Sequence, residues 1–224
     1  MDDLLPAIEM ESAPNPRFSI IWLHGLGADG SDFVPLVSEL ALPADCALRF
    51  VFPHAPRIPV TCNGGYVMRA WYDIVSLESA SRSVDRAGVL ASRQAIVRLI
   101  EREIAGGVPA QRIFVAGFSQ GGSVAYMTAL SYPEKLAGLI ALSTYIPLPE
   151  LLQAEASDAN RNIPIFAAHG RADDVVSPEL GRAARTWLIE HAYPVEWHDY
   201  PMAHSLCVDE IDAIGQWLRR AMTA

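Results

Sequence analysis

Short apolar runs alternate with helical patterns along most of the chain. The runs are Phe18–Leu23, Leu48–Phe52, Arg112–Phe118, Leu136–Leu142 and Ile163–Ala168. A Pro, Ser or His follows each of them directly. Continuous apolar runs of this length are typical of strands that are covered on both faces. We therefore expect these segments to lie side by side in a buried sheet.

Three other segments have the spacing of amphipathic helices. They are Asp85–Ala105, Pro178–His191 and Asp209–Met222. In the second, Ser177 is placed to cap the helix and Pro178 suits its first turn. Alternating strands and helices predict an α/β fold, with a mostly parallel central sheet and helices on both faces. Such sheets bind ligands at the carboxyl ends of their strands, so the residues that end each run are the first candidates for a site.

Nothing in the sequence divides the chain into parts. It has 224 residues without a repeat, a low-complexity tract or a long polar linker, which favours a single domain over 1–224. The longest irregular stretch spans about 53–84 and is rich in Pro, Gly, Ser and aromatic residues. A loop of that length inside a compact domain is usually functional, and its aromatic residues favour an ordered conformation.

Composition and charge exclude several classes of protein. A hydrophobic content of 51% with 19% charged residues is typical of a globular chain. The 17 basic and 26 acidic residues give a net charge of −9, which argues against nucleic acid as a partner. We find no secretory signal and no uncharged apolar stretch of about 18 residues, so no stable membrane insertion is expected. Three cysteines without a CxxC pair favour the reducing cytoplasm.

The strongest chemical signal is the segment GFSQG at 117–121. It follows a strand-like run and precedes a helical segment, as a G-x-S-x-G nucleophile elbow requires. The serine of such an elbow lies on a strained turn, and its two glycines avoid clashes with the neighbouring strand and helix. Ser119 is therefore the candidate nucleophile, in preference to Cys62 and Cys207, neither of which lies in an elbow.

A nucleophilic serine needs a histidine base, and the base needs an acid that orients it. After this kind of elbow the acid comes next in the chain, followed by the histidine. His204 lies between a strand-like segment and the last helix, where the base belongs. His169 competes for this role, although packing or a backbone hydrogen bond suits its position better. Asp173 and Asp174 both follow the run that ends at Ala168, and spacing alone does not choose between them.

Two backbone N–H groups should stabilise the oxyanion formed at the serine. One is expected from Gln120, directly after the nucleophile, and one from Leu26 in the loop LHGLGADG at 23–30. The same loop matches G-x-G-x-x-G at 25–30, which is the alternative hypothesis of a dinucleotide site. The second strand, however, lacks the acid at its end that would bind the ribose. We expect His24 to be structural and not a second base.

These segments together resemble the phospholipase/carboxylesterase family of α/β-hydrolases, which includes acyl-protein thioesterases and bacterial carboxylesterases. The resemblance rests on LHGLGADG (23–30), PHAPRIPVTCNGGYVMRAWYDI (53–74), GFSQGGSVA (117–125), HGRADDVV (169–176) and MAHS (202–205), in family order. It implies the α/β-hydrolase fold and a triad of Ser119, Asp173 and His204. In this family the acid is the third residue after His-Gly, which selects Asp173.

The resemblance also implies a reaction and its binding site. Leu26 and Gln120 are the implied oxyanion donors. The implied substrate-binding residues are Gly64, Gly65, Trp71, Tyr72 and Val176. Hydrolysis of short- to medium-chain acyl esters is the expected activity, with acyl-protein thioesterase or lysophospholipase activity as the alternative. No cofactor or metal is expected, and the frequent dimers of this family leave a homodimer open.

Overall fold

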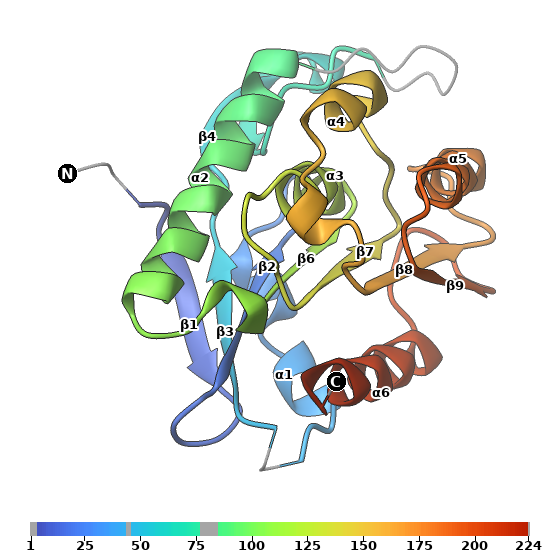
Figure 1. The fold of residues 1–224 in the computed structure, drawn as a ribbon. Coiled ribbons are helices and arrows are strands. Elements are labelled where there is room, and N and C mark those ends of the chain that lie inside the picture. The colour runs from blue at the N-terminus through green and yellow to red at the C-terminus, as the bar shows by residue number, and fades with distance from the viewer. Residues whose placement is uncertain (1–3, 44–45, 77–84, 224) are drawn as a thin grey trace.

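The computed structural model describes residues 4–43, 46–76 and 85–223 (Figure 1). Its main sheet has seven strands in the order β1-β3-β2-β6-β7-β8-β9. β1 pairs antiparallel with β3, and every other neighbouring pair is parallel. The strands are β1 (Ala7–Glu11), β2 (Phe18–Leu23), β3 (Leu48–Pro53), β6 (Ile113–Phe118), β7 (Gly138–Leu142), β8 (Ile165–Gly170) and β9 (Val195–Tyr200). The mostly parallel sheet predicted from the apolar runs is confirmed.

Helices cover both faces of this sheet, as Figure 1 shows. One face carries α2 (Arg86–Ala105), α3 (Gln120–Ala129), α4 (Pro149–Glu155) and α5 (Pro178–Glu190), and the other carries α1 (Leu36–Glu39) and α6 (Val208–Thr223). Ile21 of β2 belongs to the first core and its neighbour Ile20 to the second, and both are fully buried. Burial on both faces explains why the strands are continuously apolar. Among the described residues, no helix is long and apolar enough to cross a membrane.

The sequence-based prediction lacks β1, β4, β5 and the short helices α1 and α4. β1 is a short edge strand in which Ile8 and Met10 pack on the core while Glu9 and Glu11 are exposed. The irregular stretch 53–84 contains a small antiparallel sheet of β4 (Arg57–Val60) and β5 (Tyr66–Arg69). Its final part, 77–84, lies outside the described residues. Ser177 precedes α5 as expected, but its side chain makes no capping hydrogen bond.

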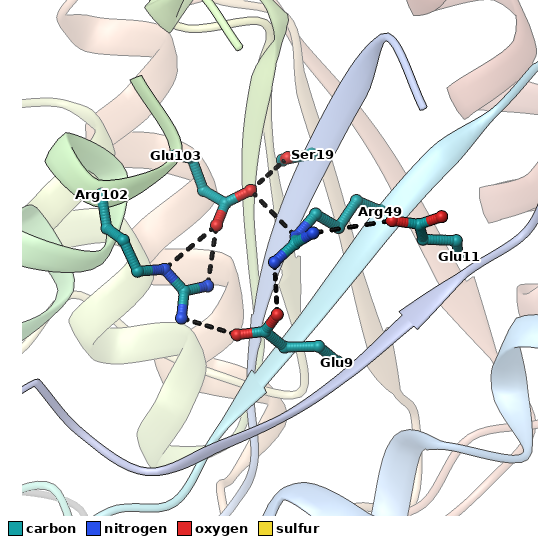
Figure 2. A network of polar contacts seen from close by, with 6 residues as sticks. All are labelled: Glu9, Glu11, Ser19, Arg49, Arg102 and Glu103. Atoms are coloured by element: carbon teal, nitrogen blue, oxygen red, sulfur yellow. Dashed lines mark hydrogen bonds and ion pairs between the residues drawn. The ribbon is translucent and has the colours of Figure 1, made fainter. Parts of the chain in front are cut away.

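A partly buried ion network fastens the edge strand and the end of α2 to the sheet. Figure 2 shows the six residues of this arginine network: Glu9, Glu11, Ser19, Arg49, Arg102 and Glu103. Glu103 is at its centre with a side chain only 4% exposed. It pairs with Arg102 at 2.7 Å and with Arg49 at 3.4 Å, and it accepts a hydrogen bond from Ser19 at 2.6 Å. Both arginines also pair with Glu9, which links β1 to β3 and α2.

Candidate active site

Ser119 lies on a strained turn between β6 and α3. Its φ of 54° and ψ of −122° fall where residues other than glycine are rarely found. The flanking glycines make the turn sterically feasible. A Cβ on Gly117 would come within 2.4 Å of the Gly121 backbone, and a Cβ on Gly121 within 2.4 Å of the Leu23 carbonyl oxygen. The Ser119 N–H donates to the Leu142 carbonyl at 2.9 Å, which fixes the turn to β7.

The side chains of Ser119, His204 and Asp173 form one chain of hydrogen bonds. The Ser119 hydroxyl donates to Nε2 of His204 at 2.9 Å, and Nδ1–H of His204 donates to Oδ2 of Asp173 at 2.7 Å. The neighbouring Asp174 is exposed. The geometry therefore pairs the histidine with Asp173, the aspartate that family resemblance selects and spacing alone does not. This arrangement can transfer a proton from the hydroxyl to the imidazole.

Asp173 is buried but well supplied with donors. Its side chain is 0% exposed, and its Oδ1 accepts from the N–H groups of Val175 at 2.9 Å and Val176 at 2.8 Å. Burial alone would raise the pKa of Asp173. The hydrogen bonds from His204 and from these two N–H groups outweigh burial and hold the pKa below its usual range. The carboxylate is thus ionised at neutral pH and can stabilise a charged imidazole on His204.

His169 supports the loop that carries this carboxylate. β8 extends to Gly170, so His169 lies inside the strand and not after it. Its ring is 1% exposed, and Nε2 donates to the Val176 carbonyl at 2.8 Å. Nε2 also lies 3.4 Å from Oδ2 of Asp173. Burial lowers the pKa of His169. The backbone hydrogen bond expected for this histidine is confirmed.

The two expected oxyanion donors flank the nucleophile. Gln120 is the first residue of α3, so its N–H has no acceptor within the helix. In the part of the chain that the structure describes, the N–H of Leu26 has no backbone acceptor either. The Leu26 loop packs closely, because a Cβ on Gly25 would lie 3.4 Å from Cβ of Ser119. Both N–H groups are available for an oxyanion beside Ser119.

Trp71 holds the side chain of Gln120 and the carbonyl of His24. Among the described residues it does not line a cavity at Ser119. Its backbone N–H donates to Oε1 of Gln120 at 2.8 Å, while its indole N–H donates to the His24 carbonyl at 2.8 Å. Nε2 of Gln120 in turn donates to the Tyr72 carbonyl at 2.7 Å. Sequence reasoning assigned Trp71 to substrate binding. It could not reveal these cross-links, which join segments 47 to 49 residues apart.

Two cavities meet at Ser119, and both are lined by Leu26 and Val175. The larger has a volume of about 460 Å³ and is also lined by Asp32, Phe33, Phe118, His204 and Leu206. The smaller has a volume of about 40 Å³ and is also lined by Tyr72, Ile74, Gln120, Tyr145 and Val176. The serine can therefore hold two parts of a substrate in separate, mostly apolar spaces of very different size.

Gly64 and Gly65 line neither of these cavities. They form the turn that leads into β5, with φ values of 66° and 77° that favour glycine. Asp73 anchors the end of the same loop by accepting from the N–H of Thr61 at 2.7 Å and its hydroxyl at 2.5 Å. Of the five expected substrate-binding residues, Tyr72 and Val176 reach a cavity, whereas Trp71 and the two glycines do not.

The glycine-rich loop at 25–30 does not lead into a long helix. It continues as a 3-10 turn over Gly30–Phe33, capped by Asp29, and then as the four-residue α1. A dinucleotide site needs a helix whose N-terminus meets the pyrophosphate. β3 also ends at Pro53, without the acid that would bind the ribose. The local structure thus opposes the dinucleotide hypothesis.

Comparisons with known proteins identify the family of the chain. A family described as Phospholipase/Carboxylesterase matches residues 6–222. Acyl-protein thioesterase 1 of Neurospora crassa is 40% identical over 224 residues, which cover 96% of this chain and 89% of that protein. The crystal structure of Arabidopsis thaliana SOBER1 has a TM-score of 0.87 at 33% identity, covering 92% of this chain and 99% of that one. The crystal structure of Zea mays acyl-protein thioesterase 2 has a TM-score of 0.83 at 28% identity, and the match covers 97% of this chain and 100% of that one. The chain is a hydrolase with the α/β-hydrolase fold, and it belongs to the phospholipase/carboxylesterase family.

Proposed function

We propose that this protein is a serine carboxylesterase that hydrolyses short- to medium-chain acyl esters. The observation that carries the proposal is the hydrogen-bond chain from Ser119 through His204 to Asp173. It lies beside two available backbone N–H groups, those of Leu26 and Gln120. A nucleophile, a base, an orienting acid and an oxyanion site are the parts that acyl transfer to water requires.

In the first half of the reaction, Oγ of Ser119 attacks the acyl carbon while its proton passes to Nε2 of His204. The resulting oxyanion accepts hydrogen bonds from the N–H groups of Leu26 and Gln120. Asp173 holds the opposite side of the ring and stabilises its positive charge. The bond to the alcohol oxygen then breaks, the alcohol takes the proton from His204, and the acyl group remains on Ser119.

In the second half, water attacks the acyl carbon and gives its proton to His204. The oxyanion forms again at the same N–H groups. When it collapses, the bond to Oγ of Ser119 breaks, the serine recovers its proton from His204, and the carboxylic acid leaves. The two halves consume one ester and one water and release one alcohol and one acid, without a cofactor.

The two cavities indicate how the substrate lies. His204 protonates the departing alcohol, and it lines the larger cavity, so we place the alcohol there. The acyl chain then enters the smaller cavity between Tyr72 and Val176. A volume of about 40 Å³ holds roughly three water-sized groups. This space fits a short acyl chain and so supports the short end of the proposed range.

Acyl-protein thioesterase or lysophospholipase activity is the second candidate. It is favoured by the 40% identity to acyl-protein thioesterase 1 of Neurospora crassa. A thiol can leave through the same steps with sulfur in place of oxygen as the leaving atom. A lysophospholipid is itself an ester, and its glycerophosphoryl headgroup leaves as an alcohol. The larger cavity is open enough for either group. Under this alternative, the long acyl chain needs more space than the smaller cavity provides.

A substrate panel separates these candidates. p-Nitrophenyl esters from C2 to C16 are assayed beside lysophosphatidylcholine and palmitoyl-CoA. We expect the highest kcat/KM for the short esters, and a preference for palmitoyl-CoA or lysophosphatidylcholine would transfer the proposal to the second candidate. Ser119→Ala should lower kcat by about 10⁶-fold and abolish fluorophosphonate labelling. Ser38→Ala removes an exposed serine of α1 and serves as the matched control.

A further inference from the structure

His24 is fully buried directly after β2, and both of its ring nitrogens have partners. The backbone N–H of Ala55 donates to Nε2 at 3.0 Å. A backbone N–H can only donate, so Nε2 must carry the lone pair and Nδ1 must carry the proton. Nδ1–H then donates to the carbonyl of Gly25 at 2.7 Å. The hydrogen bonds fix one tautomer of a neutral ring.

The Gly25 carbonyl belongs to the peptide unit that contains the Leu26 N–H. A trans peptide is planar, and its C=O and N–H point in opposite directions. Whatever holds the carbonyl of Gly25 therefore also sets the direction of the Leu26 N–H. The N–H of Ala28 approaches the same carbonyl at 3.4 Å, which is a weaker contact than that of His24.

Rotation of this peptide would have a direct chemical consequence. The Gly25 backbone lies close to Ser119, because a Cβ added to Gly25 would be only 3.4 Å from Cβ of the serine. A rotated peptide would present the carbonyl oxygen where the oxyanion forms, so two negative oxygens would face each other. The preceding peptide is held separately, because the indole N–H of Trp71 donates to the carbonyl of His24. That contact does not set the Gly25–Leu26 plane.

We infer that His24 is a positioning residue that holds the Gly25–Leu26 peptide with its N–H toward the oxyanion. The inference rests on the proposed function and adds a residue that touches no reacting atom. Burial lowers the pKa of His24, which keeps the ring in the required neutral form. A proton on Nε2 would also point at the N–H of Ala55, so the hydrogen bonds themselves oppose charging.

Replacing His24 by asparagine or by glutamine tests the two contacts of the ring one at a time. The amide of asparagine occupies the place of Nδ1, so His24→Asn keeps a donor for the Gly25 carbonyl. The amide of glutamine reaches the place of Nε2, so His24→Gln keeps only an acceptor for the N–H of Ala55. We expect His24→Gln to lower kcat for p-nitrophenyl acetate about 10²-fold with KM within about twofold. His24→Asn should keep kcat within about fivefold.

The active enzyme in each preparation is counted from the end point of fluorophosphonate labelling, so that misfolded protein does not lower kcat. Equal kcat values for the two His24 variants, both high or both low, would overturn the inference. Ser119→Ala is assayed beside them. If it is inactive, failure of the His24 comparison leaves the proposed function standing, whereas an active Ser119→Ala overturns the proposed function itself.

Nitrogen-15 spectra of the wild-type histidine rings supply a measurement that needs no variant to fold. The inference requires a proton on Nδ1 of His24 at the pH of the assay. Because Nε2 accepts from the N–H of Ala55, we expect one protonated and one unprotonated ring nitrogen. A neutral ring with its proton on Nε2 would overturn the positioning role, because Nδ1 could not then donate to the Gly25 carbonyl.

Discussion

Asp173 and Glu103 are withdrawn from water almost equally, yet they have opposite kinds of partner. Their side chains are 0% and 4% exposed. Asp173 accepts from two backbone N–H groups and from the ring of His204. Glu103 instead lies between Arg49 and Arg102, which carry permanent charges (Figure 2). The first carboxylate has a partner that can gain and lose a proton, and the second does not.

The two regions lie at opposite ends of the same elements. Ser19, the second residue of β2, belongs to the arginine network, and His24 follows the other end of the strand. On α2, the hydroxyl of Ser92 donates to the Trp71 carbonyl near the site, while Glu103 lies in the last turns of the helix. An arginine beside Asp173 would compete with a charged His204 for the carboxylate. Neutral hydrogen-bond donors suit a carboxylate that has to stabilise a charged histidine. Permanently charged partners suit an ion network that holds two structural elements together.

The largest difference between the regions should appear in Asp173→Asn. An amide cannot stabilise a charged imidazole, and its NH₂ group favours the wrong tautomer of His204. We expect kcat for p-nitrophenyl acetate to fall about 10⁴-fold. The change in the free energy of unfolding should be far smaller than the increase in activation free energy that this fall represents. Asp174→Asn removes the exposed neighbour and should leave kcat within about twofold. A larger loss at Asp174 would exchange the roles of the two aspartates.

Glu103→Gln should have the opposite effect: it should lower stability and leave activity nearly unchanged. Loss of the central carboxylate leaves Arg49 and Arg102 without their buried partner, although both keep Glu9. We expect the free energy of unfolding in urea to fall by about 3 kcal/mol and kcat to stay within about twofold. Glu11→Gln removes an exposed partner of Arg49 and should cost about 0.5 kcal/mol or less. A loss of kcat comparable to that of Asp173→Asn would show that the two regions are coupled.

The sequence predicts the arrangement around Ser119 better than it predicts the arginine network. The elbow around Ser119 and the loop before His204 carry local signals, because a strained turn and a strand end each demand particular residue types. The choice of Asp173 over Asp174 needed family resemblance, since both follow the same strand. That the chain forms a single domain and that it forms a homodimer both stay predictions.

Two of the missed features, β1 and the arginine network, depend on contacts between distant segments. β1 is only five residues long, and its alternating Ile8, Glu9, Met10 and Glu11 become a strand because β3 pairs with it. The arginine network joins residues up to 93 positions apart, so no local pattern reports it. The same holds for the ring contacts of His24: the sequence predicts a structural histidine, and only the fold shows which carbonyl it holds.

Glu210 offers the smallest and most specific test, because it is a buried carboxylate with neither kind of partner. It is fully buried in the first turn of α6, six residues after His204, and has no side-chain hydrogen bond among the described residues. Burial raises the pKa of Glu210 to about 8, and the nearby backbone N–H of Cys207 offsets this only in part.

The folded protein thus keeps a proton on Glu210 that the unfolded chain loses at lower pH. The stability that this proton contributes is complete below the unfolded pKa, near 4.5, and is lost as the pH rises through about 8. Relative to Glu210→Gln, the wild type should lose about 1 kcal/mol of unfolding free energy between about pH 6.5 and pH 7.5. Parallel pH profiles of the two proteins in urea would show instead that Glu210 is ionised in the fold and has a partner like those of Asp173.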